Sequence, residues 1–69
     1  MIVYSLWWHE RGAHDDTLDD VFPDEESARK TANQILVQDN IDAVYVYKCH
    51  LTEFGLRVAK LIYQQEKKQ

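Results

Sequence analysis

Polar and apolar residues alternate along two stretches of the chain. In residues 2–9 one face carries Ile2, Tyr4, Leu6 and Trp8, and the other carries Val3, Ser5, Trp7 and His9. Residues 41–51 alternate in the same way, with Ala43, Tyr45, Tyr47 and Cys49 opposite Val44, Val46, Lys48 and His50. A period of two in residues rich in β-branched and aromatic types predicts a β-strand in each stretch.

A helical period appears between these two strands. Apolar residues recur at helical spacing at positions 28, 32, 35 and 36, which predicts a helix over residues 25–38. Pro23 precedes Asp24, a good N-cap, and Asn40 is placed to end the helix in the left-handed conformation. Two exposed pairs should add a few tenths of a kcal/mol each, namely Glu25–Arg29 and Glu26–Lys30.

Two segments are less clearly patterned. The polar stretch 10–16 contains Gly12 and is typical of a loop, while residues 17–22 fit either a short strand or irregular structure. The last segment fits either a hairpin, with a turn at 52–55 that uses Gly55 and a strand over 56–63, or a helix over 54–66. The turn glycine and the polar tail favour the hairpin.

These elements predict a single α+β domain over residues 1–69, built as β-α-β-β with a three- to four-stranded sheet and one helix on one face. One helix leaves the second face of the sheet open. Because both faces of the predicted strands carry large apolar side chains, we expect a dimer mate or a target protein to cover that face. The alternative is that a carboxy-terminal helix covers it.

Charge is distributed unevenly along the chain. Residues 1–26 carry a formal charge of −7 and residues 27–69 carry +3. The start of the helix accounts for the acids at 24–26, but no cap requires the acidic segment, which we define as Asp15, Asp16, Asp19 and Asp20. We expect this segment to match a basic groove on a nucleic-acid-handling protein; the alternative is a loop that only adds solubility.

Composition argues against several other functions. The net charge is −4, and the late bases Arg57, Lys60, Lys67 and Lys68 are dispersed, so direct nucleic-acid binding is not expected. No apolar run is long enough to span a membrane. The lone Cys49 is expected to be a buried thiol in a cytoplasmic protein. Cys49 precedes His50 on a strand, so the two side chains point to opposite faces and cannot form a catalytic pair. The sequence also has no glycine-rich phosphate-binding loop. We therefore expect neither an enzyme nor a cofactor.

A metal site is the second hypothesis. His9 and His14 flank several carboxylates, and imidazole with carboxylate ligates zinc, manganese or iron. The spacing of the two histidines is one residue longer than in the helical zinc-protease motif, and Gly12 between them disfavours the helix that this motif needs. The predicted site therefore contains no metal ligand, and metal binding through His9 and His14 stays an alternative.

Three segments carry a resemblance to known proteins. The run Met-Ile-Val-Tyr-x-Leu-Trp-Trp-His at 1–9, the sequence Val-Phe-Pro-Asp-Glu-Glu-Ser-Ala at 21–28 and the sequence Ala-Val-Tyr-Val-Tyr-Lys at 43–48 resemble small phage and prophage proteins built as β-α-β-β domains. The resemblance implies an inhibitor of the host-takeover or anti-CRISPR type, which binds a host or defence complex and often forms a homodimer.

The first hypothesis is thus a non-catalytic protein-binding inhibitor that blocks a nucleic-acid-handling complex of the host. Its predicted partner-binding residues combine the acids with exposed aromatics; they are Trp7, Glu10, Asp15, Asp16, Asp19, Asp20, Tyr45 and Tyr47. A third hypothesis is a structural or regulatory homodimer without an inhibitory role.

Overall fold

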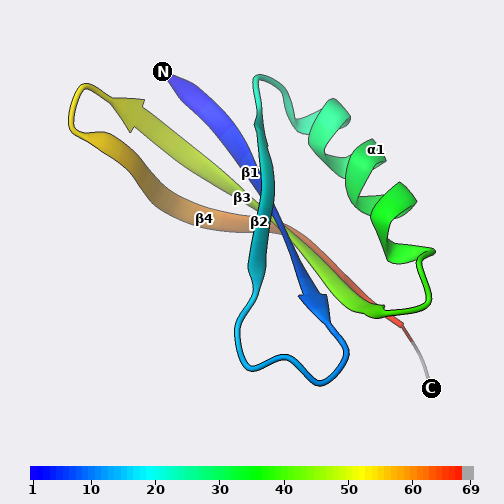
Figure 1. Ribbon diagram of the computed structural model, residues 1–69. Helices are drawn as coiled ribbons and strands as arrows, with labels where there is room; N and C mark the ends of the chain where they lie inside the picture. Colours follow the sequence, from blue (N-terminus) through cyan, green and yellow to red (C-terminus); the bar gives the residue numbers. More distant parts are fainter. Residues whose placement is uncertain (68–69) are drawn as a thin grey trace.

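The computed structural model describes residues 1–67 of the chain. Its elements follow in the order β1 (Ile2–Glu10), β2 (Thr17–Phe22), α1 (Glu25–Leu36), β3 (Ile41–Thr52) and β4 (Gly55–Glu66). The α+β prediction is confirmed: one helix lies against a four-stranded antiparallel sheet (Figure 1). Residues 17–22, for which the sequence fits either a strand or irregular structure, form the edge strand β2. Lys68 lies outside the described residues.

The sheet has the strand order β2-β1-β3-β4. The two strands predicted from alternation, β1 and β3, are its central pair, with Trp7 opposite Tyr45 and Val3 opposite Cys49. The pairing of β4 with β3 shifts between Val46 and Tyr47 and again between Lys48 and Cys49. Such irregularities bend and twist a strand.

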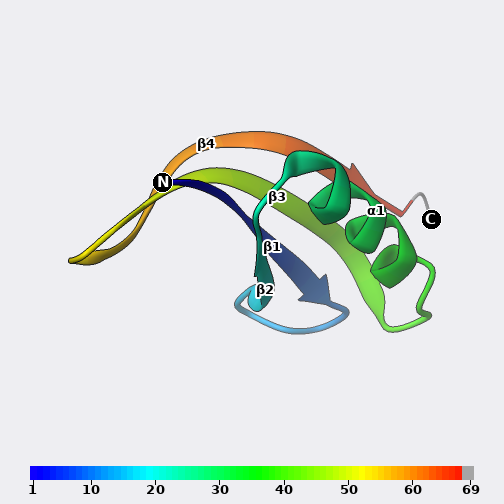
Figure 2. The same ribbon diagram turned by 90° about the horizontal axis from the view of Figure 1, so that it is seen from above.

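The last segment forms the hairpin, so the alternative helix over 54–66 is wrong. Gly55 has φ of 123°, a conformation that side chains with a Cβ rarely adopt, and Thr52 Oγ1 accepts a hydrogen bond from the Phe54 amide at 3.2 Å. Figures 1 and 2 show the hairpin of β3 and β4 extending well beyond the helix. β4 runs from 55 to 66 and is longer than the expected 56–63.

The helix begins as predicted. Asp24 Oδ1 accepts a hydrogen bond from the Ser27 amide at 2.8 Å, which satisfies one of the free donors of the first turn. Glu25 Oε2 lies 2.9 Å from Arg29 Nε, as expected. The Glu26–Lys30 pair is not formed in the described chain.

The end of the helix differs from the prediction. α1 stops at Leu36, two residues early, and Val37 caps it with a right-handed φ of −74°. Asn40 does not adopt the left-handed conformation, because all positive φ values in the described chain belong to glycines. Instead Asn40 joins the ends of β1 and β3: its carbonyl accepts from the Arg11 amide at 2.8 Å and its Nδ2 donates to Glu10 Oε1 at 3.3 Å.

The hydrophobic core lies between α1 and one face of the sheet. Leu6, Val44 and Val46 are fully buried there against Ala28 and Ala32. The small alanine side chains let the helix approach the strands closely. Tyr4 and Trp8 pack at the border of this core, so the predicted division of β1 into two faces is confirmed.

The opposite face of the sheet carries no helix within residues 1–67, as expected from a single helix. We call it the open face. It consists of the side chains that cross-strand pairing places on the side of Trp7, namely Val3, Ser5, Trp7, His9, Leu18, Val21, Ala43, Tyr45, Tyr47, Cys49, Leu51, Leu56, Val58, Leu61, Gln64 and Glu66. In the described part of the chain, no helix is long and apolar enough to cross a bilayer.

Candidate partner-binding face

A chain of hydrogen bonds fixes Trp7 at the centre of the open face. Trp7 Nε1 donates to Ser5 Oγ at 3.0 Å, Ser5 Oγ lies 3.3 Å from Cys49 Sγ, and this thiol donates to the Tyr47 carbonyl at 3.5 Å. Because Ser5 Oγ accepts from the indole, its hydroxyl hydrogen is free to donate to the thiol. Ser5 and Cys49 are fully buried under their neighbours, which confirms the prediction of a buried thiol. The indole ring is therefore held in place with its N–H turned inward.

The loop after β1 brings Asp15 and Asp16 of the acidic segment to the same face. Gly12 turns the chain with φ of 82°, and Arg11 Nε donates to Asp42 Oδ1 at 3.2 Å, which ties the loop to β3. Asp16 Oδ1 lies 3.0 Å from Nδ1 of His9, a residue of the open face. These contacts hold Asp15 and Asp16 beside the aromatic side chains.

A hollow on the open face combines the aromatic and acidic residues. We call it the Trp7 hollow, and it is lined by Trp7, Asp15, Asp16, Tyr47 and Val58. The environment of the hollow affects the neighbouring Tyr45. Desolvation raises the pKa of its phenol above the ordinary value of 10.0, and the nearby Asp16, Glu66 and Tyr47 raise it further. Aromatic rings beside carboxylates form a surface that favours cations over anions.

Five of the eight predicted partner-binding residues lie together here. Trp7, Asp15, Asp16 and Tyr47 line the hollow and Tyr45 lies opposite Trp7. The other three, Glu10, Asp19 and Asp20, do not join them. Glu10 accepts from Asn40 at the end of β1. Asp20 lies opposite Leu6 and accepts from the Val21 amide at 2.7 Å, and Asp19 falls at the register shift of β2.

An apolar stripe continues from the hollow along the hairpin. Cross-strand pairs place Val58 opposite Cys49, Leu61 opposite Tyr47 and Leu56 opposite Leu51. Leu51, Leu56, Val58 and Leu61 are each between 39 and 52% exposed. The sequence did not single out these residues, because their face depends on the hairpin register and on its irregularities.

The opposite side of the hairpin is basic. Lys48 lies opposite Lys60 and His50 opposite Arg57, and we call these four residues the basic arm. None of them belongs to the ion pairs found within residues 1–67. In the sequence Arg57 and Lys60 look dispersed, and only the hairpin pairing brings them against two further bases.

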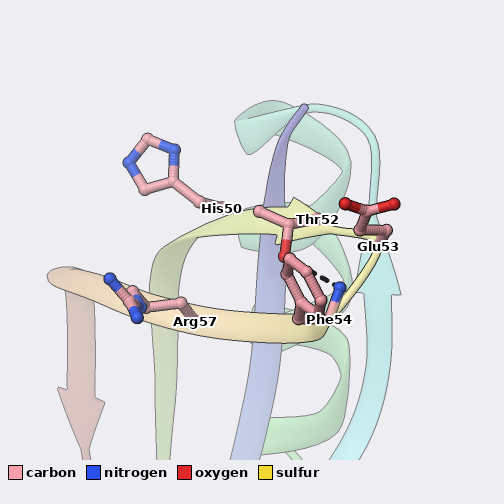
Figure 3. A pocket seen from close by; sticks show the side chains of 5 residues that line it. All are labelled: His50, Thr52, Glu53, Phe54 and Arg57. Carbon is pink, nitrogen blue, oxygen red and sulfur yellow. Dashed lines mark hydrogen bonds between the residues drawn. The ribbon is translucent and has the colours of Figure 1, made fainter.

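A second hollow lies at the tip of the hairpin and is lined by His50, Thr52, Glu53, Phe54 and Arg57. Figure 3 shows the His50 and Arg57 side chains directed to the same side, with the Phe54 ring beside Thr52. Phe54 is 92% exposed, and no residue lining this hollow is buried. The tip thus has one carboxylate and one aromatic ring, whereas the Trp7 hollow has two of each.

The metal alternative finds little support in the geometry. Within residues 1–67 no three histidine, cysteine, aspartate or glutamate side chains come together as metal ligands. His9 is paired with Asp16, and His14 does not join them. In the described chain, His9 and His14 therefore do not belong to one group of three metal ligands.

Comparisons of this chain with protein families, with curated proteins and with solved structures found no significant match.

Proposed function

We propose that the chain is a non-catalytic protein-binding inhibitor, of the phage host-takeover or anti-CRISPR type, that blocks a nucleic-acid-handling complex of a bacterial host. The observation that carries the proposal is the position of Asp15 and Asp16 beside Trp7, on a sheet face that no helix of residues 1–67 covers. A basic groove built to hold nucleic acid is the partner surface whose charge matches this face.

Each part of the face has a distinct role in such binding. Asp15 and Asp16 attract a basic surface over a distance and raise the association rate, an effect that salt screens. Trp7, Tyr45 and Tyr47 supply rigid contact area, the property that makes these residue types frequent anchors at interfaces. Once bound, the carboxylates repel phosphates from the same groove.

The proposal is tested by capturing a partner and then measuring its activity. Tagged protein is used to isolate partners from a bacterial lysate at low and high salt, and the partner is purified and assayed for nucleic-acid binding. We expect this chain to reduce that binding, and the Asp15→Asn/Asp16→Asn variant to do so at least tenfold less well at low salt.

The matched control is Asp19→Asn/Asp20→Asn, which removes the same charge outside the hollow and should weaken inhibition much less. A partner whose nucleic-acid binding is unchanged by this chain would contradict the proposal. Equal inhibition by the wild type and the Asp15→Asn/Asp16→Asn variant would exclude a role for the acidic residues of the hollow.

A homodimer is the second candidate, and the exposed apolar stripe on the open face favours it. Leucine and valine side chains on neighbouring strands suit self-association, which also supports small domains that have no disulfide. Sedimentation equilibrium over a range of concentrations tests this candidate. A dimer that Leu61→Asp dissociates would support it, and a monomer at every concentration would exclude it.

A further inference from the structure

We infer that the Trp7 hollow receives the guanidinium group of an arginine side chain of the partner protein. This inference rests on the proposed function, because it names the chemistry by which the open face recognises a basic surface.

The hollow has carboxylate acceptors without a cation. Asp16 uses Oδ1 for His9, which leaves Oδ2 available, and within residues 1–67 the Asp15 side chain makes no hydrogen bond. No lysine or arginine lines the hollow. Arg11, the base of the same loop, is held by Asp42. The two carboxylates are therefore free to receive a cation from outside.

The aromatic walls are suited to a planar cation. The Trp7 N–H is bound to Ser5, so the indole needs no polar partner from the ligand and offers its ring. Trp attracts a cation placed over its face more strongly than the other aromatic residues, and Tyr47 adds a second ring. Val58 provides apolar contact for the methylene groups of a long basic side chain.

The helix side of the molecule shows this arrangement within the chain itself. The Arg29 guanidinium carbon lies 4.7 Å from the centre of the Tyr63 ring, while Arg29 Nε lies 2.9 Å from Glu25 Oε2. One guanidinium thus lies against an aromatic ring and a carboxylate together. The Trp7 hollow has two aromatic rings and two carboxylates, and no lysine or arginine lines it.

Arginine suits the hollow better than lysine. The guanidinium is planar and weakly hydrated, it stacks on aromatic rings, and it forms two parallel hydrogen bonds with a carboxylate. An ammonium is a strongly hydrated point charge that does not match this geometry.

The test uses three blocked tripeptides with glycine on both sides of arginine, lysine or citrulline, which is the uncharged analogue of arginine. The reporter is the NMR resonance of the Trp7 Nε1–H, assigned by its loss in Trp7→Phe. We expect the arginine peptide to shift this resonance saturably, with an association constant at least threefold above that of lysine, and citrulline to cause no saturable shift.

Two substitutions locate the binding. Asp15→Asn should lower the association constant for the arginine peptide about threefold and Asp15→Asn/Asp16→Asn about tenfold, whereas Asp19→Asn/Asp20→Asn should change it less than twofold. Asp15 makes no side-chain hydrogen bond in the described chain, so the single variant keeps the loop intact. Equal shifts from arginine and citrulline, equal affinity for lysine, or an unchanged constant in Asp15→Asn/Asp16→Asn would overturn the inference.

The test is separable from that of the proposed function because it needs no partner. If the hollow binds arginine but no partner is inhibited, the inference of an arginine site stands and the proposed inhibitor function is wrong. If a partner is inhibited but the hollow does not bind arginine, the proposed function stands and the inference of an arginine site is wrong. The partner would then dock through other contacts of the open face.

Discussion

Trp7 and Trp8 are neighbours in the sequence but lie on opposite faces of the sheet. Trp8 packs at the border of the core beneath α1, whereas Trp7 lines the hollow beside Asp15 and Asp16. This follows from the alternation of side chains along β1. One tryptophan therefore stabilises the domain, and the other is available to a partner.

The hydrogen bond from Trp7 to Ser5 leads to the first prediction. Ser5→Ala removes the acceptor, leaves the partly buried indole N–H without its partner, and should lower the free energy of unfolding by about 1–3 kcal/mol. Urea unfolding measures this change. Ser27→Ala is the control, because its hydroxyl bonds Asp24 at an exposed position and its loss should cost about 0.5 kcal/mol or less. Equal costs for the two variants would contradict the role assigned to Ser5.

The second prediction concerns Tyr45. Desolvation, followed by Asp16, Glu66 and Tyr47, raises the pKa of its phenol above 10.0, so the folded state favours the neutral form. The contribution of Tyr45 to stability is therefore complete below the ordinary pKa and is lost as the pH rises through the folded-state value. Ultraviolet titration of the wild type against Tyr45→Phe should show Tyr45 ionising later than a free tyrosine.

The variant Asp16→Asn separates the causes of this shift. It should lower the pKa of Tyr45 only in part, because desolvation is the larger cause and remains. A Tyr45 that titrates like a free tyrosine in the wild type would show that the open face is more solvated than the structure indicates.

The third prediction concerns the contact between His9 Nδ1 and Asp16 Oδ1. Both side chains are about one-third exposed, at 30 and 38%, so His9→Ala should cost less than about 1 kcal/mol of stability. Its main effect should be on the loop: amide hydrogens of residues 13–16 should exchange faster while those of β3 do not change. Unchanged exchange in the loop would mean that Arg11 and Gly12 hold it without His9.

The fourth prediction concerns the basic arm. Like charges placed directly opposite each other on adjacent strands are unfavourable, and Lys48 lies opposite Lys60. Lys60→Glu should therefore raise the free energy of unfolding by about 0.2–1 kcal/mol, less at high salt. Lys48→Glu/Lys60→Glu restores the repulsion and should return the stability toward that of the wild type. A stabilisation that persists in the double variant would show a different cause.

The regular elements could be predicted because their patterns have one interpretation. Alternation from Ile2 to His9 fits only a strand, and Asp24 before a helical period fits only a helix start. The last segment was ambiguous because Val58, Leu61 and Ile62 are spaced compatibly with both a helix and a bulged strand. The structure resolves it: Leu61 lies opposite Tyr47, while Ile62 packs toward the core.

The candidate site could be predicted only in part. Trp7, Tyr45 and Tyr47 followed from strand alternation, and the acids followed from the charge distribution. That Asp15 and Asp16 reach the aromatic residues while Asp19 and Asp20 do not depends on the turn at Gly12 and on the contacts of the loop with other strands. Local sequence carries no signal for such long-range contacts.

In the proposed complex, the partner covers the open face and leaves the helix side free. The most direct measurement labels both tryptophans with fluorine and records the solvent isotope shift of each ¹⁹F resonance with and without the captured partner. We expect the exposure of Trp7 to solvent to fall when the partner binds, and the exposure of Trp8 to stay the same. Loss of exposure at Trp8 with no change at Trp7 would place the partner on the helix side and contradict the claim.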